Sequence, residues 1–232
     1  MTTCLFLSFR SRSNPSLATG EIARLHELLR ATPKLSKALV HTWASADDPY
    51  IKDEPPPQLV LQLYFAELPD LEAAMGRGGH LGVLTSPDEF PSLARSDATQ
   101  QAMVARIFAV PEPAIQAAPG EPYCTYLVSY EGTADDLNAW LDHYLDKHTK
   151  HMACFPSIRE LEVYTCLDWV SAMPWRRVNF MQRNKVAFDS PNALTQALHS
   201  PVRHEMRADY KTFPPFSGPV NHFAMATRVV RP

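Results

Sequence analysis

The chain has 232 residues, of which 45% are hydrophobic and 20% charged, and its formal net charge is -3 at pH 7. This composition allows one large domain or two small ones with a buried core, and it argues against general disorder. Because no run of Lys or Arg stands out, nothing supports a nucleic acid or an anionic membrane as a partner. No apolar run approaches the roughly 20 residues that a membrane span needs.

The first predicted element is an alternating strand over residues 1–10. This segment lacks the basic region and cleavage site of a signal peptide, so we expect a cytoplasmic protein. In that compartment cysteines without CxxC spacing are expected to be free thiols rather than disulfides or zinc ligands. The chain has four of them: Cys4, Cys124, Cys154 and Cys166.

The elements that follow occur in two similar copies. Four blocks recur in the same order at nearly one spacing, which is typical of a duplicated unit. They pair 4–9 with 126–130, 33–43 with 156–166, 65–75 with 188–198, and 102–110 with 224–230. Between the copies, "PEPAIQAAPGEP" at 111–122 is typical of a stiff linker. We therefore predict two units, 1–112 and 121–232, joined by residues 113–120.

Each unit is predicted to run strand, helix, strand, strand, helix, strand. In the second copy, "CTYLVSY" alternates as a strand does, and a helix capped by Thr133 follows over 133–152. Strands are predicted near 158–166 and 176–189, then a helix opened by Ser190, and a last strand at 222–230. This order predicts the α+β class, as two ferredoxin-like (βαββαβ) plaits packed sheet to sheet in an intrachain α/β barrel.

The segment "WLDHYLDKHTKHMACFPSIRELEVY" resembles the helix-into-strand signature of dimeric α/β-barrel proteins. The segment "FDSPNALTQALHSPVRHEMRADYKTFPPFSGPVNHFAM" is similar to the second half of their EthD-like branch, including the stretch from Asp209 and Tyr210 to Phe213. The resemblance covers about the last 110 residues, and it extends to the first half only through the internal repeat. It implies a small-molecule ligand, a histidine in the cleft between helix and sheet, and a monomer or a homodimer.

Three histidines fall close together in "HYLDKHTKHM". At 100° per residue, His148 shares the apolar stripe of its helix with Trp140 and Tyr144, while His143 lies about 140° away. His143 and His151 are therefore expected to be solvated, and no metal site is predicted. His148 is either a buried histidine satisfied by a backbone carbonyl or an acid/base group, since imidazole titrates near neutrality.

Other candidates come from the strands. Tyr164 could hold an oxyanion beside His148, but if the Leu161 face of its strand lies under the helices, Tyr164 points away. A pocket around the pair is predicted from residues that could equally be core aromatics or strand-end residues. They are Trp140, Tyr144, Trp169, His41 (the repeat partner of Tyr164) and His222.

Three functions remain open. The first is a cofactor-free isomerase, dehydratase or oxygenase that acts on a small organic acid or aromatic intermediate through proton transfer by His148. The second is a heme-binding barrel with His204 as the axial ligand, and the third is a non-catalytic binding or accessory protein. No GxGxxG, P-loop, HExxH or GxSxG motif is present, so the first function is expected to need no cofactor.

Overall fold

The computed structural model describes residues 2–11, 16–51, 56–118 and 120–231. Its centre is a closed barrel of eight antiparallel strands in the order β1-β3-β2-β11-β5-β9-β7-β4, with β4 returning to β1. The strands are β1 (Thr3–Arg10), β2 (Leu35–Trp43), β3 (Leu59–Phe65), β4 (Asp97–Phe108), β5 (Tyr123–Tyr130), β7 (Glu160–Cys166), β9 (Gln182–Phe188) and β11 (Val220–Arg231). The expected α+β class is confirmed.

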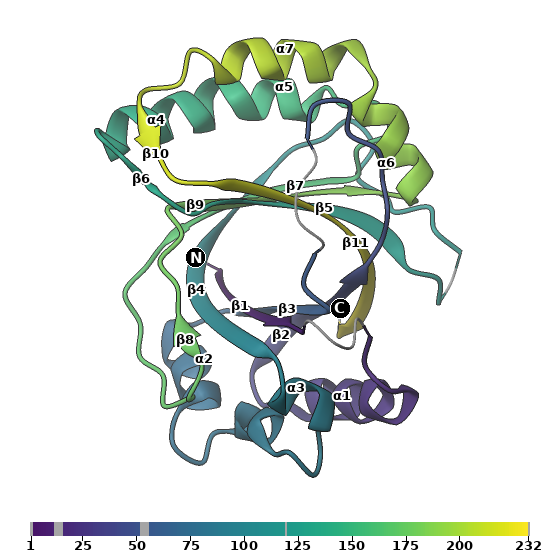
Figure 1. Cartoon of the computed structure of the whole chain (residues 1–232), viewed down its shortest axis with the longest axis vertical. Coiled ribbons are helices and arrows are strands. Elements are labelled where there is room, and N and C mark those ends of the chain that lie inside the picture. The colour runs from purple at the N-terminus through teal and green to yellow at the C-terminus, as the bar shows by residue number, and fades with distance from the viewer. Residues whose placement is uncertain (1, 12–15, 52–55, 119, 232) are drawn as a thin grey trace.

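Short strands and helices complete the fold on opposite sides of the barrel (Figure 1). One side carries α1 (Thr19–Ala31), α2 (Leu68–Met75), the 3-10 helix η1 (His80–Thr85) and α3 (Pro91–Ala94). The other carries α4 (Leu137–His143), the π-helix η2 (Tyr144–His148), α5 (Thr149–Ala153), α6 (Pro191–Leu198) and α7 (Pro201–Tyr210). The short strand β8 (Arg176–Arg177) pairs with β4, and β6 (Thr133–Ala134) pairs with β10 (Phe216–Ser217). No described helix is long and apolar enough to cross a membrane.

The two halves join differently from the prediction. The strands of the first half lie in the order β4-β1-β3-β2, and those of the second half in the same internal order, β11-β5-β9-β7. The halves do not pack as two separate sheets. Instead β2 pairs with β11 and β4 pairs with β7, so both seams are hydrogen-bonded ladders. Joining the edges leaves no long strand of the barrel with unpaired backbone groups.

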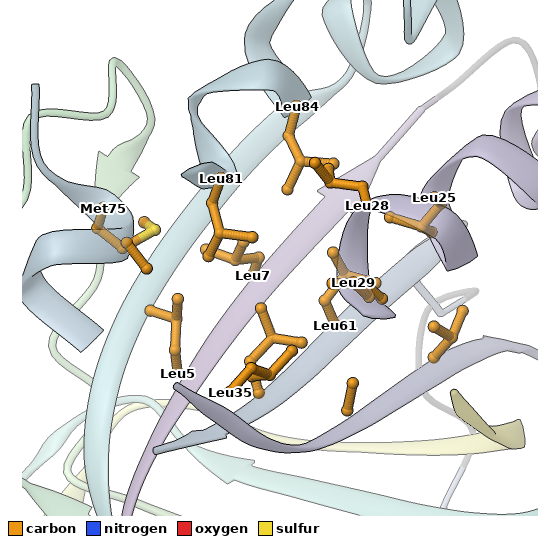
Figure 2. Close-up of a cluster of buried hydrophobic side chains, with 14 of the residues drawn as sticks. Leu5, Leu7, Leu25, Leu28, Leu29, Leu35, Leu61, Met75, Leu81 and Leu84 are labelled. Carbon is orange, nitrogen blue, oxygen red and sulfur yellow. The ribbon is translucent and has the colours of Figure 1, made fainter. Parts of the chain in front are cut away.

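Three apolar clusters follow from the alternation of the strands. In the first half, leucines of the outer face, such as Leu5, Leu7 and Leu61, pack under helix residues such as Leu25 and Leu29 (Figure 2). A second cluster lies between the outer face of the second half and α4 to α7. The third fills the barrel lumen. Residues of β7 alternate between these layers, because successive side chains of a strand point to opposite faces.

The helix predicted over residues 133–152 begins later and is not a regular α-helix throughout. Thr133 belongs to β6, and the N-cap of α4 is Asp136, whose side chain accepts a hydrogen bond from the Ala139 N–H at 3.0 Å. After one more turn the chain changes to a π-helix, in which the backbone N–H of Thr149 donates to the carbonyl of Tyr144, five residues earlier. A π-turn holds one residue more than an α-turn, and such bulges are frequent at functional sites.

Candidate active site

A cavity of about 410 Å³ lies between the outer face of the second-half sheet and the helices that cover it. Strands β5, β9 and β11 form its floor, and η2, α5 and α7 form its roof. Much of its wall is aromatic, through Tyr50, Tyr126, Tyr130, Tyr144, Phe155 and Tyr210. A mostly apolar cavity of this size with a few polar groups is typical of a small-molecule site.

His148 lies on the wall of this cavity and is held by a carboxylate. Its Nδ1 is 2.8 Å from Asp209 Oδ2, and the other carboxylate oxygen, Oδ1, is 2.9 Å from His143 Nε2. Asp209 is in the last turn of α7, so this contact joins two helices across the cavity roof. Nε2 of His148 has no hydrogen-bond partner within the described part of the chain, and the residue lines the cavity.

The π-helix explains why two histidines reach one carboxylate. In a regular α-helix, His143 and His148 would point about 140° apart. The extra residue in the π-turn brings residues five apart onto one face, and both imidazoles then face Asp209. The expectation that His143 is solvated is therefore wrong, since its side chain is only 11% exposed. His151 is more open, at 38%, and lies 3.7 Å from Glu205.

The environment keeps His148 neutral at pH 7. Burial lowers its pKa to about 4, although the hydrogen bond and the charge of Asp209 act in the opposite direction. For Asp209, burial alone would raise the pKa, but the hydrogen bonds from His148 and His143 outweigh it and lower the pKa. A neutral imidazole beside an ionised carboxylate carries its proton on the nitrogen that faces the carboxylate. The Nδ1–H therefore donates to Asp209, and Nε2 presents a lone pair to the cavity.

A second polar group lies on the floor of the cavity near His148. Asn184 Nδ2 donates to Tyr144 Oη at 2.6 Å, and this hydroxyl donates to the sulfur of Met152 at 3.6 Å. The Tyr144 and His148 rings lie 5.0 Å apart. Oδ1 of Asn184 is buried without a partner among the described residues. A sulfur is a weak acceptor, so the Tyr144 hydroxyl has a stronger hydrogen bond to offer to a ligand.

The outer rim of the cavity carries charge. Asp48 accepts hydrogen bonds from Tyr126 Oη and from Arg203 Nη2, both at 2.9 Å. The guanidinium of Arg207 lies 4.4 Å from the centre of the Tyr50 ring, which it covers. The Tyr50 hydroxyl is hydrogen-bonded to Nδ1 of His204. His204 is exposed and does not line the cavity, so the structure does not place it as an axial heme ligand.

Tyr164 does not meet His148. Leu161 and Val163 belong to the cluster under the helices, whereas Tyr164 belongs to the lumen cluster on the other face of the sheet. Its hydroxyl donates to Glu162 Oε2 at 2.7 Å. The sequence-based pairing of Tyr164 with His148 is therefore corrected by the ordinary alternation of β7.

His41 is also in the lumen. Its Nδ1 lies 2.8 Å from Thr227 Oγ1 and its Nε2 lies 3.1 Å from Gln62 Oε1. Burial lowers its pKa to about 3. Because His41 and Tyr164 both face the lumen, neither belongs to the cavity under the helices.

The remaining predicted residues are divided between the two halves. Tyr144 and His222 line the cavity. Trp140 is fully buried behind it and stacks on Tyr144 at 5.1 Å. Trp169 packs in the first-half cluster, beneath the guanidinium of Arg177, so it lies outside the predicted pocket.

Two functional candidates were missed by sequence reasoning. The resemblance includes Asp209 without giving it a role, and Asn184 falls within the predicted strand 176–189 with no functional signal of its own. Both reach the site through tertiary contacts between distant elements, for which no local spacing is a signal. Within the described residues, no group of three His, Cys, Asp or Glu side chains is arranged to hold a metal ion.

Neither a protein-family model nor a curated protein matches this chain. Solved structures do match in fold. An anthrone oxidase-like protein aligns with a TM-score of 0.63 and 14% identity, over 99% of this chain and 93% of its own. A monooxygenase-like protein from Lactobacillus acidophilus aligns with a TM-score of 0.55 and 11% identity, over 99% and 96%. A mutant chlorite dismutase from Candidatus Nitrospira defluvii aligns with a TM-score of 0.52 and 10% identity, over 97% and 91%.

The alignments with these structures over nearly the whole chain confirm the barrel fold that the resemblance implied. At such low identity the similarity shows the fold alone, because one fold hosts many reactions.

Proposed function

We propose that the cavity is an active site in which His148 acts as a general base on a small aromatic or organic acid substrate, without a bound cofactor. The observation that carries this proposal is a neutral imidazole whose Nδ1 is held by Asp209 while Nε2 faces a cavity of about 410 Å³. A positioned base of this kind contributes roughly 10²- to 10⁴-fold to a rate.

In this mechanism, Nε2 of His148 takes a proton from a substrate carbon whose C–H bond is acidified by a carbonyl group, either directly attached or conjugated through a ring. Asp209 stabilises the imidazolium that forms and keeps the ring in place. Negative charge develops on the substrate oxygen, and the Tyr144 hydroxyl, which accepts from Asn184 Nδ2 at 2.6 Å and whose ring lies 5.0 Å from that of His148, donates a hydrogen bond to it. This assigns to Tyr144 the oxyanion role that the sequence suggested for Tyr164.

Among the three reaction types, an oxygenase is the one we favour, because two neighbours are described as anthrone oxidase-like and monooxygenase-like. The anion left by proton removal would add to O₂, and the peroxide anion that forms would take the proton back from the His148 imidazolium. Loss of water from this hydroperoxide leaves a ketone, so the two atoms of O₂ end in the ketone and in water. Oxygen uptake with anthrone as the probe, at pH 7 and in the presence of a chelator, tests the proposal. Wild-type uptake no faster than the uncatalysed rate would argue against the oxygenase.

The same imidazole supports a second candidate, a heme site. An axial histidine commonly donates its other N–H to a carboxylate, which is the arrangement of His148 and Asp209. Arg203 and Arg207 at the rim could pair with the propionates. Heme would supply one-electron or O₂ chemistry, and His148 would take the axial role first considered for His204. A Soret band that disappears in His148→Gln would favour heme over the cofactor-free enzyme.

A third reading is a non-catalytic binding protein. It needs the cavity but no proton transfer, so ligands would bind equally well to wild type and His148→Gln and would be recovered unchanged. Mass spectrometry of ligands that co-purify with the protein distinguishes this reading from the enzyme.

The tandem duplication, with units 1–112 and 121–232 and linker 113–120, also stays a proposal, as does membership of the EthD-like branch. The same internal strand order in both halves supports the duplication. We further propose a cytoplasmic monomer or homodimer, and four free thiols are compatible with a reducing compartment. Light scattering on the purified protein tests its assembly.

A further inference from the structure

A second, smaller cavity of about 230 Å³ opens at one end of the barrel lumen. It lies where β1 and β5 end and where β4, β9 and β11 begin. Its polar wall includes Ser8, Thr99, Ser129, Arg183 and Asn221. The two cavities lie on opposite faces of the sheet, since Asn184 faces the helices while its neighbour Arg183 faces the lumen.

Arg183 is the unusual group of this cavity. Its guanidinium carbon lies over two aromatic rings, 4.8 Å from the centre of Phe6 and 4.5 Å from that of Phe180. Its N–H donors lie in the guanidinium plane and remain for hydrogen bonds. The one such bond among the described residues is long, from Nε to Gln101 Oε1 at 3.4 Å.

The two Nη nitrogens of Arg183 therefore have no hydrogen-bond partner in the described chain, and they are not sealed off from the cavity. No carboxylate lies within ion-pair distance of Arg183 in that part of the chain. Burial lowers its pKa to about 10, so it stays charged at pH 7. The charge of Glu131 acts on Arg183 from beyond ion-pair distance, so this partly buried guanidinium lacks a direct carboxylate partner, which is costly. A planar guanidinium edge matches a carboxylate in bidentate geometry.

The neighbouring acids limit the charge of a ligand. Glu131 Oε1 accepts hydrogen bonds from Asn221 at 2.7 Å and from Ser129 at 3.1 Å. Asp97 lies 3.5 Å from Arg176. The cavity wall holds these two carboxylates and three cations, Arg10, Arg176 and Arg183, so its formal charge is +1 (3 − 2), which a monoanion balances and a dianion exceeds.

We propose that this mouth of the barrel binds a small carboxylate monoanion through the guanidinium edge of Arg183. The cavity is smaller than the roughly 300–1,000 Å³ of ordinary ligand pockets, so its ligand is a small acid. Hydroxyl and amide groups of Thr99 and Asn221 are near enough to share in binding, and Phe180 and Phe223 offer apolar contact to the rest of the acid. This site is independent of the proposed chemistry at His148.

The test is a titration of ¹⁵N-labelled protein with benzoate, followed by amide chemical shifts. We expect saturable shifts at Thr99 and Ser129, which report on the barrel mouth separately from Tyr144 and Met152 in the larger cavity. Arg183→Gln should weaken binding at the mouth by about tenfold or more, the loss expected for a charge-assisted hydrogen bond. Arg183→Lys should retain part of the affinity, and Arg207→Gln, at the rim of the larger cavity, should leave the mouth unaffected.

A second variant keeps the proposal testable if Arg183→Gln does not fold. Thr99→Leu places an apolar side chain in the mouth and should block binding while Arg183 remains. If benzoate shifts the amides of the mouth in both variants as it does in wild type, the proposal is overturned. It is also overturned if benzoate shifts only Tyr144 and Met152 in wild type. Inorganic phosphate that binds the mouth as tightly as benzoate would overturn the carboxylate assignment.

Discussion

At the scale of single residues, the bond between His148 and Asp209 decides what the imidazole can do. With Nδ1–H donated to the carboxylate, only Nε2 can take a proton, and it is the nitrogen that faces the cavity. Asp209 also accepts a hydrogen bond from His143. Two donors therefore stabilise its charge, and two turns of the opposite helix fix its position. Such support of a base by a positioned carboxylate is the usual way to select one tautomer.

Substitution of His148 is the direct test of this role. Gln keeps a hydrogen-bond donor for Asp209 but cannot take up a proton near neutral pH. In His148→Gln, we expect oxygen uptake with anthrone to fall by roughly 10²- to 10⁴-fold, with a melting temperature close to that of wild type. His151→Gln, on the more exposed side of the same helix, is the control and should keep wild-type activity. Full activity in His148→Gln would mean that this histidine is a structural residue.

The lowered pKa values also predict how stability depends on pH. His148, with a pKa of about 4, and His41, with a pKa of about 3, bind protons less readily in the folded state than in the unfolded chain, where the pKa is near 6.5. As pH falls below 6.5, the unfolded state gains protons that the folded state does not, so the free energy of unfolding decreases. The loss continues until the folded-state pKa values are passed, at about 1.4 kcal/mol per pKa unit.

Urea unfolding at pH 7 and pH 5 measures this effect. Wild type should be less stable at pH 5, and His148→Gln should show a smaller difference between the two pH values, because one of the two shifted groups is gone. An identical pH difference in both proteins would show that His148 titrates normally in the folded state.

At the scale of elements, the π-turn in η2 places His143 and His148 on one face. The sequence shows the apolar stripe that puts Tyr144 and His148 toward the sheet, and this part of the prediction holds. It does not show the change of helical period, because a π-turn is stabilised by tertiary contacts such as those of Asp209 and leaves no mark on local spacing. The same limitation applies to β7. The sequence shows that its side chains alternate between two faces, but it does not show which face the helices cover.

Deletion of Asp146 tests the π-turn. Removing one exposed residue from η2 should convert it to a regular α-turn and leave His143 and His148 four residues apart, about 40° around the helix. Both imidazoles can then still reach Asp209, so we expect the deletion variant to keep activity and a circular dichroism spectrum close to those of wild type. Asp146→Ala is the matched control, since it keeps the chain length and removes only an exposed pair with Lys150. Loss of activity in the deletion variant but not in the control would contradict the role given to the π-turn, which is to accommodate one extra residue between the two histidines.

At the scale of the whole molecule, the lumen joins the two halves of the chain. The repeat predicted the order of elements in each half, and composition and periodicity were sufficient for that. They could not predict the seams, because the pairing of β2 with β11 and of β4 with β7 joins residues far apart in sequence. Nor could they predict that His41, Gln62 and Tyr64 from the first half meet residues of the second half inside the barrel.

Lys185 is the central charge of that lumen. It is fully buried, and its Nζ lies 2.8 Å from Glu162 Oε1 and 2.6 Å from Glu160 Oε2. Tyr64 and Tyr164 donate to the other oxygen of Glu162, both at 2.7 Å, so the carboxylate is shared by both halves. Burial alone would favour the neutral amine, but the charges around it outweigh this and raise the pKa of Lys185.

Lys185→Met should therefore be much more damaging than the loss of a surface charge. It leaves Glu162 buried without a cation, and removal of one partner of a buried pair costs about 3–5 kcal/mol. Lys37→Met is a matched control: Lys37 lies 3.7 Å from the same Glu160, but its side chain is 30% exposed, so we expect a loss of at most about 1 kcal/mol. Adding Glu162→Gln to Lys185→Met should restore part of the stability, because it removes the uncompensated charge. If urea unfolding shows equal losses for the two lysine variants, or no recovery in the double variant, then the charge of Lys185 does not stabilise the lumen network in which Tyr64 of the first half donates to Glu162 of the second.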